Sequence, residues 1–484
     1  MLGYFSNTLY SFRGVFSRQS SWVIFCMVII GFIGGSEMVG ITSFCRFWGF
    51  DVNGYYTFLH FFRYSSWSLE MLMIQWTTFV LAQGLTVMVQ GRAILLGDHT
   101  YAPKDGRRMP GVVTLHQDSE TQSKPSYFRG HHWGAICLMI GSLLSPFGLP
   151  LVLGIHQGLS HIDKGTEANP DPDNLKTRII RMALDFSLRH HLPCLLVLDA
   201  YFPCASVFHL AASIWSIELK APLITLIIRA KNNCVAYYEA PKVEGKRPKG
   251  RPAQYGKKVK LTDFFDKPHW FSRQPCQVYG KIEEISVLAI NLFWKPTGNL
   301  IRFVLATTSR GAIVLMCSDL NQDPLVAIRL YCARTRIEMM FDMLKNLIGA
   351  FCYRFWSKFL PRHSRNPQKN QQLQKPSPNH IDKVRLCWNA YERFTMLAAI
   401  SLGILQLMAL KFSAEIWKEY DGFLRTCSRE LPSERTVKHV MARLLIRNFF
   451  IIAPITIMRE IRRRYFRKNA HFQHTDPVEC INSG

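Results

Sequence analysis

The chain has 484 residues, 48% hydrophobic and 19% charged, a composition typical of a folded globular protein and a length that corresponds to about three domains. The net charge of +25, from 59 basic and 34 acidic residues, favours a polyanionic partner, either nucleic acid or an anionic membrane surface. The 13 cysteines include no CxxC pair, which argues against a zinc ribbon or a secreted disulfide framework and favours a reducing, cytosolic setting.

Residues 1–85 are predicted to form a helical DNA-binding region. Their longest apolar run, which begins at Trp22, is shorter than the roughly 20 residues of a membrane span, so a buried helix is expected. Two short amphipathic helices are expected around a turn at Asp51–Gly54. This pattern is compatible with a helix-turn-helix that reads the major groove, and equally with a small helical bundle that does not contact DNA. A membrane protein built around Trp22–Gly35 is the least favoured alternative.

Short strands and one helix are predicted next. The apolar run CLLVLDAYF, from Cys194 to Phe202, is typical of a strand buried on both faces, and Asp199 lies near its end. Asp98 is expected to follow an earlier strand, and a longer apolar segment begins at Trp133. The remaining expectations are strands over Ala93–Leu96, Val112–Leu115, Leu151–Gly154 and Leu223–Ile228, an amphipathic helix over Leu175–Arg189, and a helix at about 203–218.

A strongly basic segment covers residues 242–260 and contains eight Lys or Arg residues against one acid. Because Gly and Pro are interleaved with the charges, an extended, flexible loop that contacts phosphates is predicted, with an ordinary solvated loop as the alternative. A β-rich insertion is expected at about 231–300, followed by a hairpin that turns at Ser309–Gly311. The candidate DNA-binding residues of the loop are Lys246, Arg247, Lys249, Arg251, Lys257 and Lys258.

The stretch Tyr331–Lys345 contains no Gly or Pro and is predicted to be one helix. At about 100° per residue, the side chains of Tyr331, Arg334, Glu338 and Lys345 fall within an arc of about 60°. The alternative is a solvated face with an incidental ion pair between Arg334 and Glu338. Residues 361–380 are predicted to be a linker. Residues 381–484 are predicted to form a helical region for dimerisation or DNA contact, with a basic stripe at Arg459–Lys468.

Asp98, Asp199 and Glu338 together form a candidate catalytic site. In open α/β sheets, reactive groups gather at strand ends, and two Asp and one Glu from separate elements can bind two divalent cations about 3.5–4 Å apart. Mg²⁺ suits such a site because it takes few carboxylates and completes its shell with water and phosphate oxygens. In-line phosphodiester cleavage or strand transfer is therefore expected. Arg334 and Lys345 would offset the repulsion between these carboxylates and a phosphate, and Tyr331 could hydrogen-bond a phosphate or stack.

Several other polar residues receive structural interpretations. Asp319 is expected to cap the helix that begins near Asn321–Pro324. The pair His131-His132 lacks a third ligand at a suitable spacing and is assigned a structural role. His99 and Thr100 are expected either to orient Asp98 by hydrogen bonds or, for Thr100, to serve as a simple turn residue.

The spacing Tyr-x2-Arg-x3-Glu-x6-Lys from Tyr331 to Lys345 resembles the signature of bacterial insertion-sequence transposases of the Asp-Asp-Glu type, and all four positions match. The stretches GDHTYAPKDGRRMPG around Asp98 and LLVLDAYF around Asp199 resemble the first and second acid regions of these enzymes. YRFWSKFLPR and the basic loop resemble one subfamily. The resemblance covers about residues 90–362 and is weaker on either side.

This resemblance implies an α/β protein whose ribonuclease-H-like (retroviral-integrase-like) catalytic domain covers residues 86–360, carries the β-rich insertion, and is flanked by N- and C-terminal helical regions. It implies a cut-and-paste DNA transposase that binds the terminal inverted repeats of its element and target DNA as a homodimer in a synaptic complex. Two Mg²⁺ ions, replaceable by Mn²⁺, are the implied cofactors. The implied location is the bacterial cytoplasm, at the nucleoid, without a membrane partner.

Two further expectations follow from the same resemblance. Related enzymes can release their element through DNA hairpins with a base flipped onto an aromatic residue, and Trp294 is the candidate for that role. A tryptophan that packs the core of the insertion is the alternative. For the whole chain, the alternative function is a catalytically inactive DNA-binding protein of transposase descent.

Overall fold

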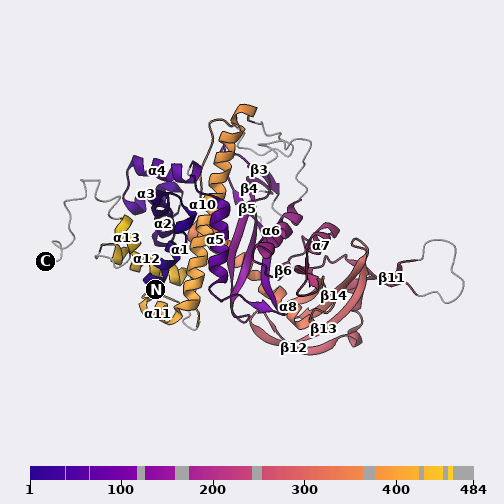
Figure 1. Ribbon diagram of the computed structural model, residues 1–484. Helices are drawn as coiled ribbons and strands as arrows, with labels where there is room; N and C mark the ends of the chain where they lie inside the picture. The colour runs from indigo at the N-terminus through magenta and orange to yellow at the C-terminus, as the bar shows by residue number, and fades with distance from the viewer. Residues whose placement is uncertain are drawn as a thin grey trace.

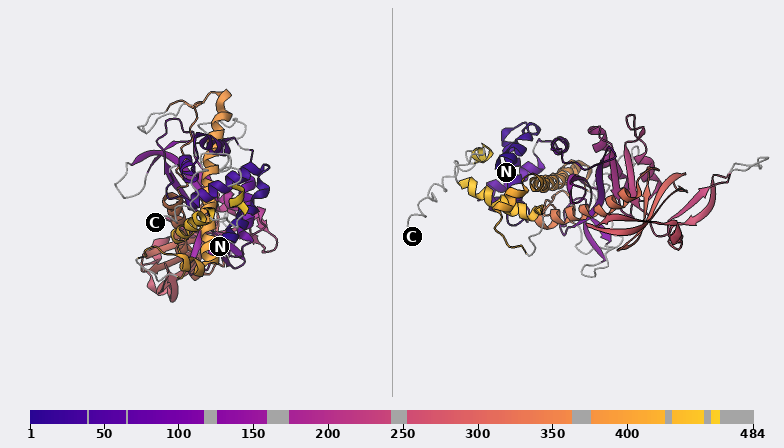
Figure 2. Two further views of the ribbon diagram at one scale, coloured as in Figure 1. Left: turned by 90° about the vertical axis from the view of Figure 1, so that its left-hand side faces the viewer. Right: turned by 90° about the horizontal axis from the view of Figure 1, so that it is seen from below.

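The computed structural model describes residues 1–461 except 39, 65, 117–125, 159–173, 242–252, 363–375, 425–429 and 451–455. The protein is a mixed α/β structure built on one large sheet of 13 strands, with helices gathered mainly at one end (Figure 1). Two further views show that the molecule is elongated, with the N- and C-terminal helices at one end and the strands of the insertion at the other (Figure 2). The candidate site lies in the part of the sheet between these ends.

Five strands form the central part of the sheet, in the spatial order β5-β4-β2-β6-β9. β4 is antiparallel to both β5 and β2, whereas β6 is parallel to both β2 and β9. All five residues of β6 are buried, as expected for a strand covered on both faces. The bounds of these strands are β2 Arg92–Pro103, β4 Tyr127–Gly141, β5 Pro146–Ile155, β6 Cys194–Leu198 and β9 Ile224–Arg229.

Most expected elements of this central part are confirmed. The helix α6 covers Leu175–Arg189 as predicted, and its side-chain cap is Asn174. The strand expected over Ala93–Leu96 is longer than predicted, so Asp98 lies inside β2 and not after it. The reason is that β4 pairs with β2 from Leu95 to Pro103, although the parallel pairing with β6 ends at Leu96.

Other elements of the central part differ more in extent. α7 (Ala205–Ala211) is shorter than the helix predicted at about 203–218, because the chain then enters a small hairpin of β7 (Trp215–Ser216) and β8 (Ala221–Pro222). β3 (Val113–His116) pairs with β4, and the two-residue strand β1 (Met88–Val89) pairs with β2.

The strands expected at about 231–300 are present, and they extend the central sheet beyond β9. The predicted hairpin is also confirmed, since β14 and β15 pair up to Thr308 and Gly311. The end of the predicted basic loop is instead strand β11, an antiparallel partner of β10, and residues 242–252 of that loop lie outside the described residues. The strands are β10 (Val235–Glu239), β11 (Tyr255–Lys260), β12 (Ser272–Val278), β13 (Lys281–Trp294), β14 (Asn299–Thr308) and β15 (Gly311–Cys317).

The N-terminal region consists of helices, as predicted. α2 (Gln19–Gly34) is buried almost throughout, which confirms the buried helix expected there. α3 (Ile41–Trp48) ends at Gly49, whose φ of 64° suits glycine, and α4 (Val52–Arg63) begins directly after Asp51. Because the Asp51 side chain accepts hydrogen bonds from the backbone of the first turn, the residues after it belong to the helix and not to the predicted turn. α1 (Leu2–Ser11) and α5 (Leu69–Leu81) complete the region.

The C-terminal region is centred on the long helix α10 (Ile381–Lys411), which packs against β5, α2, α4 and α12. Among the described helices, only the one at Pro378–Lys411 is long and apolar enough to cross a membrane. Within the protein, 89% of its most apolar 18-residue stretch is buried. This burial is what the core helix of a globular fold shows. α11 (Ser413–Glu419), α12 (Glu434–Phe450) and α13 (Thr456–Ile461) follow. The predicted basic stripe lies outside the described residues from position 462 onward.

Candidate active site

Asp98 and Asp199 lie at the same level of two neighbouring parallel strands. Leu96 of β2 pairs with Val197 of β6, and each of these residues is followed two positions later by one of the two acids. Parallel neighbours are about 4.8 Å apart, so this register brings the two carboxylates to one edge of the sheet. Asp98 accepts a hydrogen bond from the backbone N–H of His99 at 2.7 Å, and Asp199 from that of Tyr201 at 2.9 Å.

The third acid is joined to the first through Arg334. The Nη1 atom of Arg334 lies 3.0 Å from Oδ2 of Asp98, and its Nη2 atom donates to Oε1 of Glu338. The structure therefore connects Asp98, Arg334 and Glu338 directly, although 236 residues separate Asp98 from Arg334. The interaction between Arg334 and Glu338 is part of this site and not an isolated surface ion pair.

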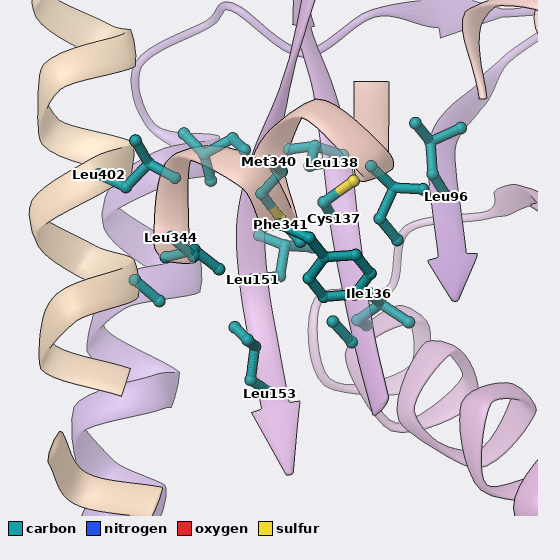
Figure 3. Close-up of a cluster of buried hydrophobic side chains, with 14 of the residues drawn as sticks. Leu96, Ile136, Cys137, Leu138, Leu151, Leu153, Met340, Phe341, Leu344 and Leu402 are labelled. Carbon is teal, nitrogen blue, oxygen red and sulfur yellow. The ribbon is translucent and has the colours of Figure 1, made fainter. Parts of the chain in front are cut away.

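The helix that carries Glu338 is held against the sheet by its apolar side. α9 (Thr335–Asp342) packs on β5 and β2 through Met340 and Phe341, with Leu344 following in the next turn (Figure 3). Leu96 of β2 belongs to the same cluster (Figure 3). Since side chains alternate along a strand, Asp98 lies on the same face of β2 as Leu96 and is turned toward α9. Apolar packing thus positions the acids relative to one another.

The single helix predicted over Tyr331–Lys345 is wrong in detail. α8 (Pro324–Ala333) ends just before Arg334, and α9 begins just after it. At this junction the backbone hydrogen bonds run from residue i to residue i−3. A π-helical turn, Met343–Ile348, follows α9 and contains Lys345. Tyr331 is only 6% exposed, whereas Lys345 is exposed, so the four signature residues do not share one continuous solvated face.

The three carboxylates influence one another electrostatically. Burial, together with the charges of Asp199 and Glu338, raises the pKa of Asp98 to about 6, against the opposing effect of the Arg334 guanidinium. Burial lowers the pKa of Arg334, but the charges of Asp98 and Glu338 outweigh this effect and raise it. The site therefore contains an excess of negative charge that Arg334 only partly neutralises.

The donor chemistry of this cluster fits a hard divalent cation. Carboxylate oxygens from separate elements are the ligands that Mg²⁺ prefers, and a bound cation would relieve the mutual repulsion that raises the pKa of Asp98. Within the described ranges, no group of three or more His, Cys, Asp or Glu residues is close enough to hold a metal ion as arranged. Arg334 is the side chain that holds two of these carboxylates, those of Asp98 and Glu338.

The histidines near the site have structural surroundings. The Nε2 atom of His99 lies 3.1 Å from Nδ1 of His156, and its ring stacks on Phe202, while its backbone N–H donates to Asp98. Both ring nitrogens of His131 have partners, the hydroxyl of Tyr353 and the carbonyl of Pro110. Burial lowers the pKa of His131 to about 3, so it is neutral, and these contacts agree with its predicted structural role.

The remaining predicted residues lie apart from the acids. Trp294 ends β13 and is 7% exposed, with its ring centroid 5.3 Å from that of Phe208, so it packs the interior as the alternative prediction states. Lys257 and Lys258 are exposed on β11. Asp319 accepts a hydrogen bond from the backbone of Asn321, while the helix cap predicted for it is Asp323. The other predicted loop residues, Lys246, Arg247, Lys249 and Arg251, lie outside the described residues.

The sequence prediction missed two adjoining basic hollows, of which the first reaches Ala200, the residue directly after Asp199. The first, of about 390 Å³, is lined by Ala200 and by residues 229–233, which include Arg229 and Lys231. The second, of about 410 Å³, shares Arg229 and Lys231 and adds Lys260. Arg229 is the last residue of β9 and Lys231 follows it by two positions, as Asp199 follows β6, so the end of a parallel strand is the signal that could have identified these two cations.

Comparison of the chain with known protein families and with curated proteins finds no match.

Proposed function

We propose that this chain is a DNA transposase of the Asp-Asp-Glu type, which cleaves and joins DNA at the ends of its insertion sequence with Asp98, Asp199 and Glu338. The observation that carries the proposal is the convergence of these acids: two lie at one level of adjacent parallel strands, and Arg334 links the third to the first. These are the three positions at which the chain resembles the catalytic residues of such enzymes.

The sheet supports a ribonuclease-H-like core for this function. An antiparallel set of three strands, β5-β4-β2, is continued by the parallel strands β6 and β9; Asp98 lies on β2, and Asp199 directly follows β6. In the sequence, strands β10 to β15 lie between Asp199 and Glu338, where the resemblance places an insertion. This agreement of strand order with acid positions is the main structural support for the fold assignment.

The protein residues around the site suit phosphodiester chemistry. Because the pKa of Asp98 is about 6, this acid is largely ionised near pH 7.5, as a cation ligand must be. Arg229 and Lys231 provide positive charge in the hollow that reaches Ala200, next to Asp199, which suits the phosphates on either side of the reacting bond. Two Mg²⁺ ions held by the three carboxylates would polarise the attacking oxygen and stabilise the leaving oxygen. A homodimer that pairs two DNA ends completes the proposal.

A second candidate is a DNA-binding protein of transposase descent without catalytic activity. One observation favours it, namely that Arg334 engages both Asp98 and Glu338. In an inactive protein, this guanidinium would permanently replace the cation charge. In an active one, it would move to a DNA phosphate when the carboxylates bind Mg²⁺.

The test uses the purified chain and a DNA fragment that contains both ends flanking its gene. Cleavage at the ends in Mg²⁺ or Mn²⁺, lost in Asp199→Asn while end binding in a gel-shift assay is retained, is the expected result. End binding without cleavage in either metal would favour the second candidate. Absence of specific end binding would contradict both.

A further inference from the structure

A short extended segment after the candidate site presents an alternating pattern of side chains. Between Tyr353 and Phe359 the chain forms no helix or strand, yet its residues alternate between buried and exposed. Tyr353, Phe355 and Ser357 are buried. The residues between and after them, Arg354, Trp356 and Lys358, are exposed. We call these two cations and the tryptophan between them the basic ledge.

The backbone of this segment is held by side chains from three separate elements. Lys104, directly after β2, donates to the carbonyls of Phe351 and Tyr353. The hydroxyl of Tyr391 on α10 donates to the carbonyl of Phe355 at 2.8 Å, and Arg63 of α4 donates to that of Trp356. Because the inward-facing carbonyls are fixed in this way, the three ledge side chains project outward from a backbone that is already ordered.

The surroundings of the ledge are basic as well. The Nζ atoms of Lys358 and Lys383 lie 5.3 and 4.6 Å from the ring centroid of Phe359, so two cations converge on one aromatic ring. None of the ion pairs found among the described residues includes Arg354 or Lys358. The positive charge of the ledge therefore remains available to a partner.

The ledge is also connected along the chain to the candidate site. Lys104 lies six positions after Asp98 on the same strand and its continuation, and Tyr353 follows the π-helical turn that succeeds the helix of Glu338. The segments that carry Asp98 and Glu338 thus lead along the chain to Lys104, which holds the ledge, and to the ledge itself.

We infer that the basic ledge binds the sugar-phosphate backbone of duplex DNA outside the cleavage site; this inference rests on the proposed function. Extended chain rises about 3.3 Å per residue, so Arg354 and Lys358 are about 13 Å apart along the surface. A duplex presents about eight phosphate charges over that length, which gives both cations a partner. The indole of Trp356 lies between them and can pack on a deoxyribose or donate its N–H to a phosphate.

An anionic membrane is the competing polyanion, and the ledge fits it less well. Interfacial binding to lipid uses a broad apolar face buried beneath the headgroups, and binding strength scales with its area. The ledge offers one indole between two cations on a fixed, extended backbone. Duplex DNA, which is contacted mainly through charge and hydrogen bonds, is the partner this surface matches.

The test measures the affinity of a labelled duplex end over a range of salt concentrations, without divalent metal. Arg354→Gln combined with Lys358→Gln should reduce the slope of log K against log salt by about two, because each neutralised phosphate contact contributes about 0.9. The matched control is Lys281→Gln combined with Lys418→Gln, which removes two exposed cations elsewhere and should leave the slope unchanged. Trp356→Ala should weaken binding at least several-fold, whereas Trp215→Ala, at a similarly exposed tryptophan, should not.

An unchanged slope in the ledge variant would overturn the inference, even if the chain cleaves DNA as proposed. A reduced slope in a chain that never cleaves would uphold the ledge as a DNA surface and reject the proposed activity. Equal binding of the unmodified chain to phosphatidylserine vesicles, lost in the same variant, would also overturn the assignment to DNA. Melting temperatures within about 2 °C of the parent chain would show that each variant folds.

Discussion

Arg334 and Asp98 form an ion pair of 3.0 Å between side chains that are only 13% and 19% exposed. The same guanidinium also binds Glu338, so one residue neutralises two of the three acids of the candidate site. Exposed ion pairs contribute little to stability, but a largely enclosed carboxylate depends strongly on its partner. Arg334 is therefore expected to matter both for stability and for the protonation of Asp98.

Arg334→Gln should lower the free energy of unfolding by roughly 2–3 kcal/mol at pH 7.5, because it leaves Asp98 without its charged partner. The pKa of Asp98, already raised to about 6, should rise further. The loss should be smaller at pH 5, where Asp98 is protonated and does not need the cation, should grow as the pH rises from about 6 toward the higher pKa of Asp98 in the variant, and should then level off. Urea denaturation at both pH values measures the effect. Arg46→Gln, at an exposed ion pair with Glu37, should cost less than about 1 kcal/mol, and equal losses at both arginines would contradict the prediction.

Replacement of the acids by their amides should abolish DNA cleavage without preventing end binding. Asp98→Asn, Asp199→Asn and Glu338→Gln each remove one negative charge from the proposed cation site while keeping the shape of the side chain. Cleavage of a labelled end in Mg²⁺, measured beside a gel-shift assay, provides the two readouts. Asp319→Asn is the matched control, since this carboxylate accepts a hydrogen bond from the backbone of a turn. Normal cleavage by Asp199→Asn would show that the site assignment is wrong.

The central strands were predictable because their signals are local. The apolar run of β6 and the acid that follows it are visible in nine consecutive residues, and α6 has both its amphipathic pattern and its cap within 16 positions. The full length of β2 was not predictable in this way. Its extension past Asp98 depends on pairing with β4, whose residues lie about 35 positions later in the chain. Nothing in the sequence of β4 indicates the register of that pairing.

The interruption of the signature helix has a tertiary origin. No Gly or Pro marks Arg334, and the hydrogen-bond shift occurs where its side chain reaches Asp98, a residue far away in sequence. The basic ledge was missed for a similar reason. Its alternation of buried and exposed residues depends on Lys104, Arg63 and Tyr391, which come from three separate elements.

Trp294→Ala should destabilise the protein by roughly 3–5 kcal/mol, the usual cost of truncating a buried aromatic residue. Its ring is packed on Phe208, so Trp294→Phe should recover much of this loss. Denaturation curves of the two variants provide the measurement. If Trp294→Ala kept its stability and lost only binding to DNA with an unpaired base, the stacking role would be upheld against the packing role.

Glu392 provides a pH-dependent test of the packing between α10 and β5. Its carboxylate accepts a hydrogen bond from the N–H of Ile155 at 3.1 Å, and burial raises its pKa to about 7. Because this pKa is above the ordinary value of 4.5, the stabilising contribution is complete below about pH 4.5 and is lost as the pH rises through 7. Glu392→Gln keeps an oxygen acceptor without the charge. Its free energy of unfolding relative to the parent should therefore increase between pH 4.5 and 7 by up to roughly 3 kcal/mol and then level off. Glu415→Gln, at an exposed position of α11, should show no such gain, and a constant difference for Glu392→Gln would contradict the assignment.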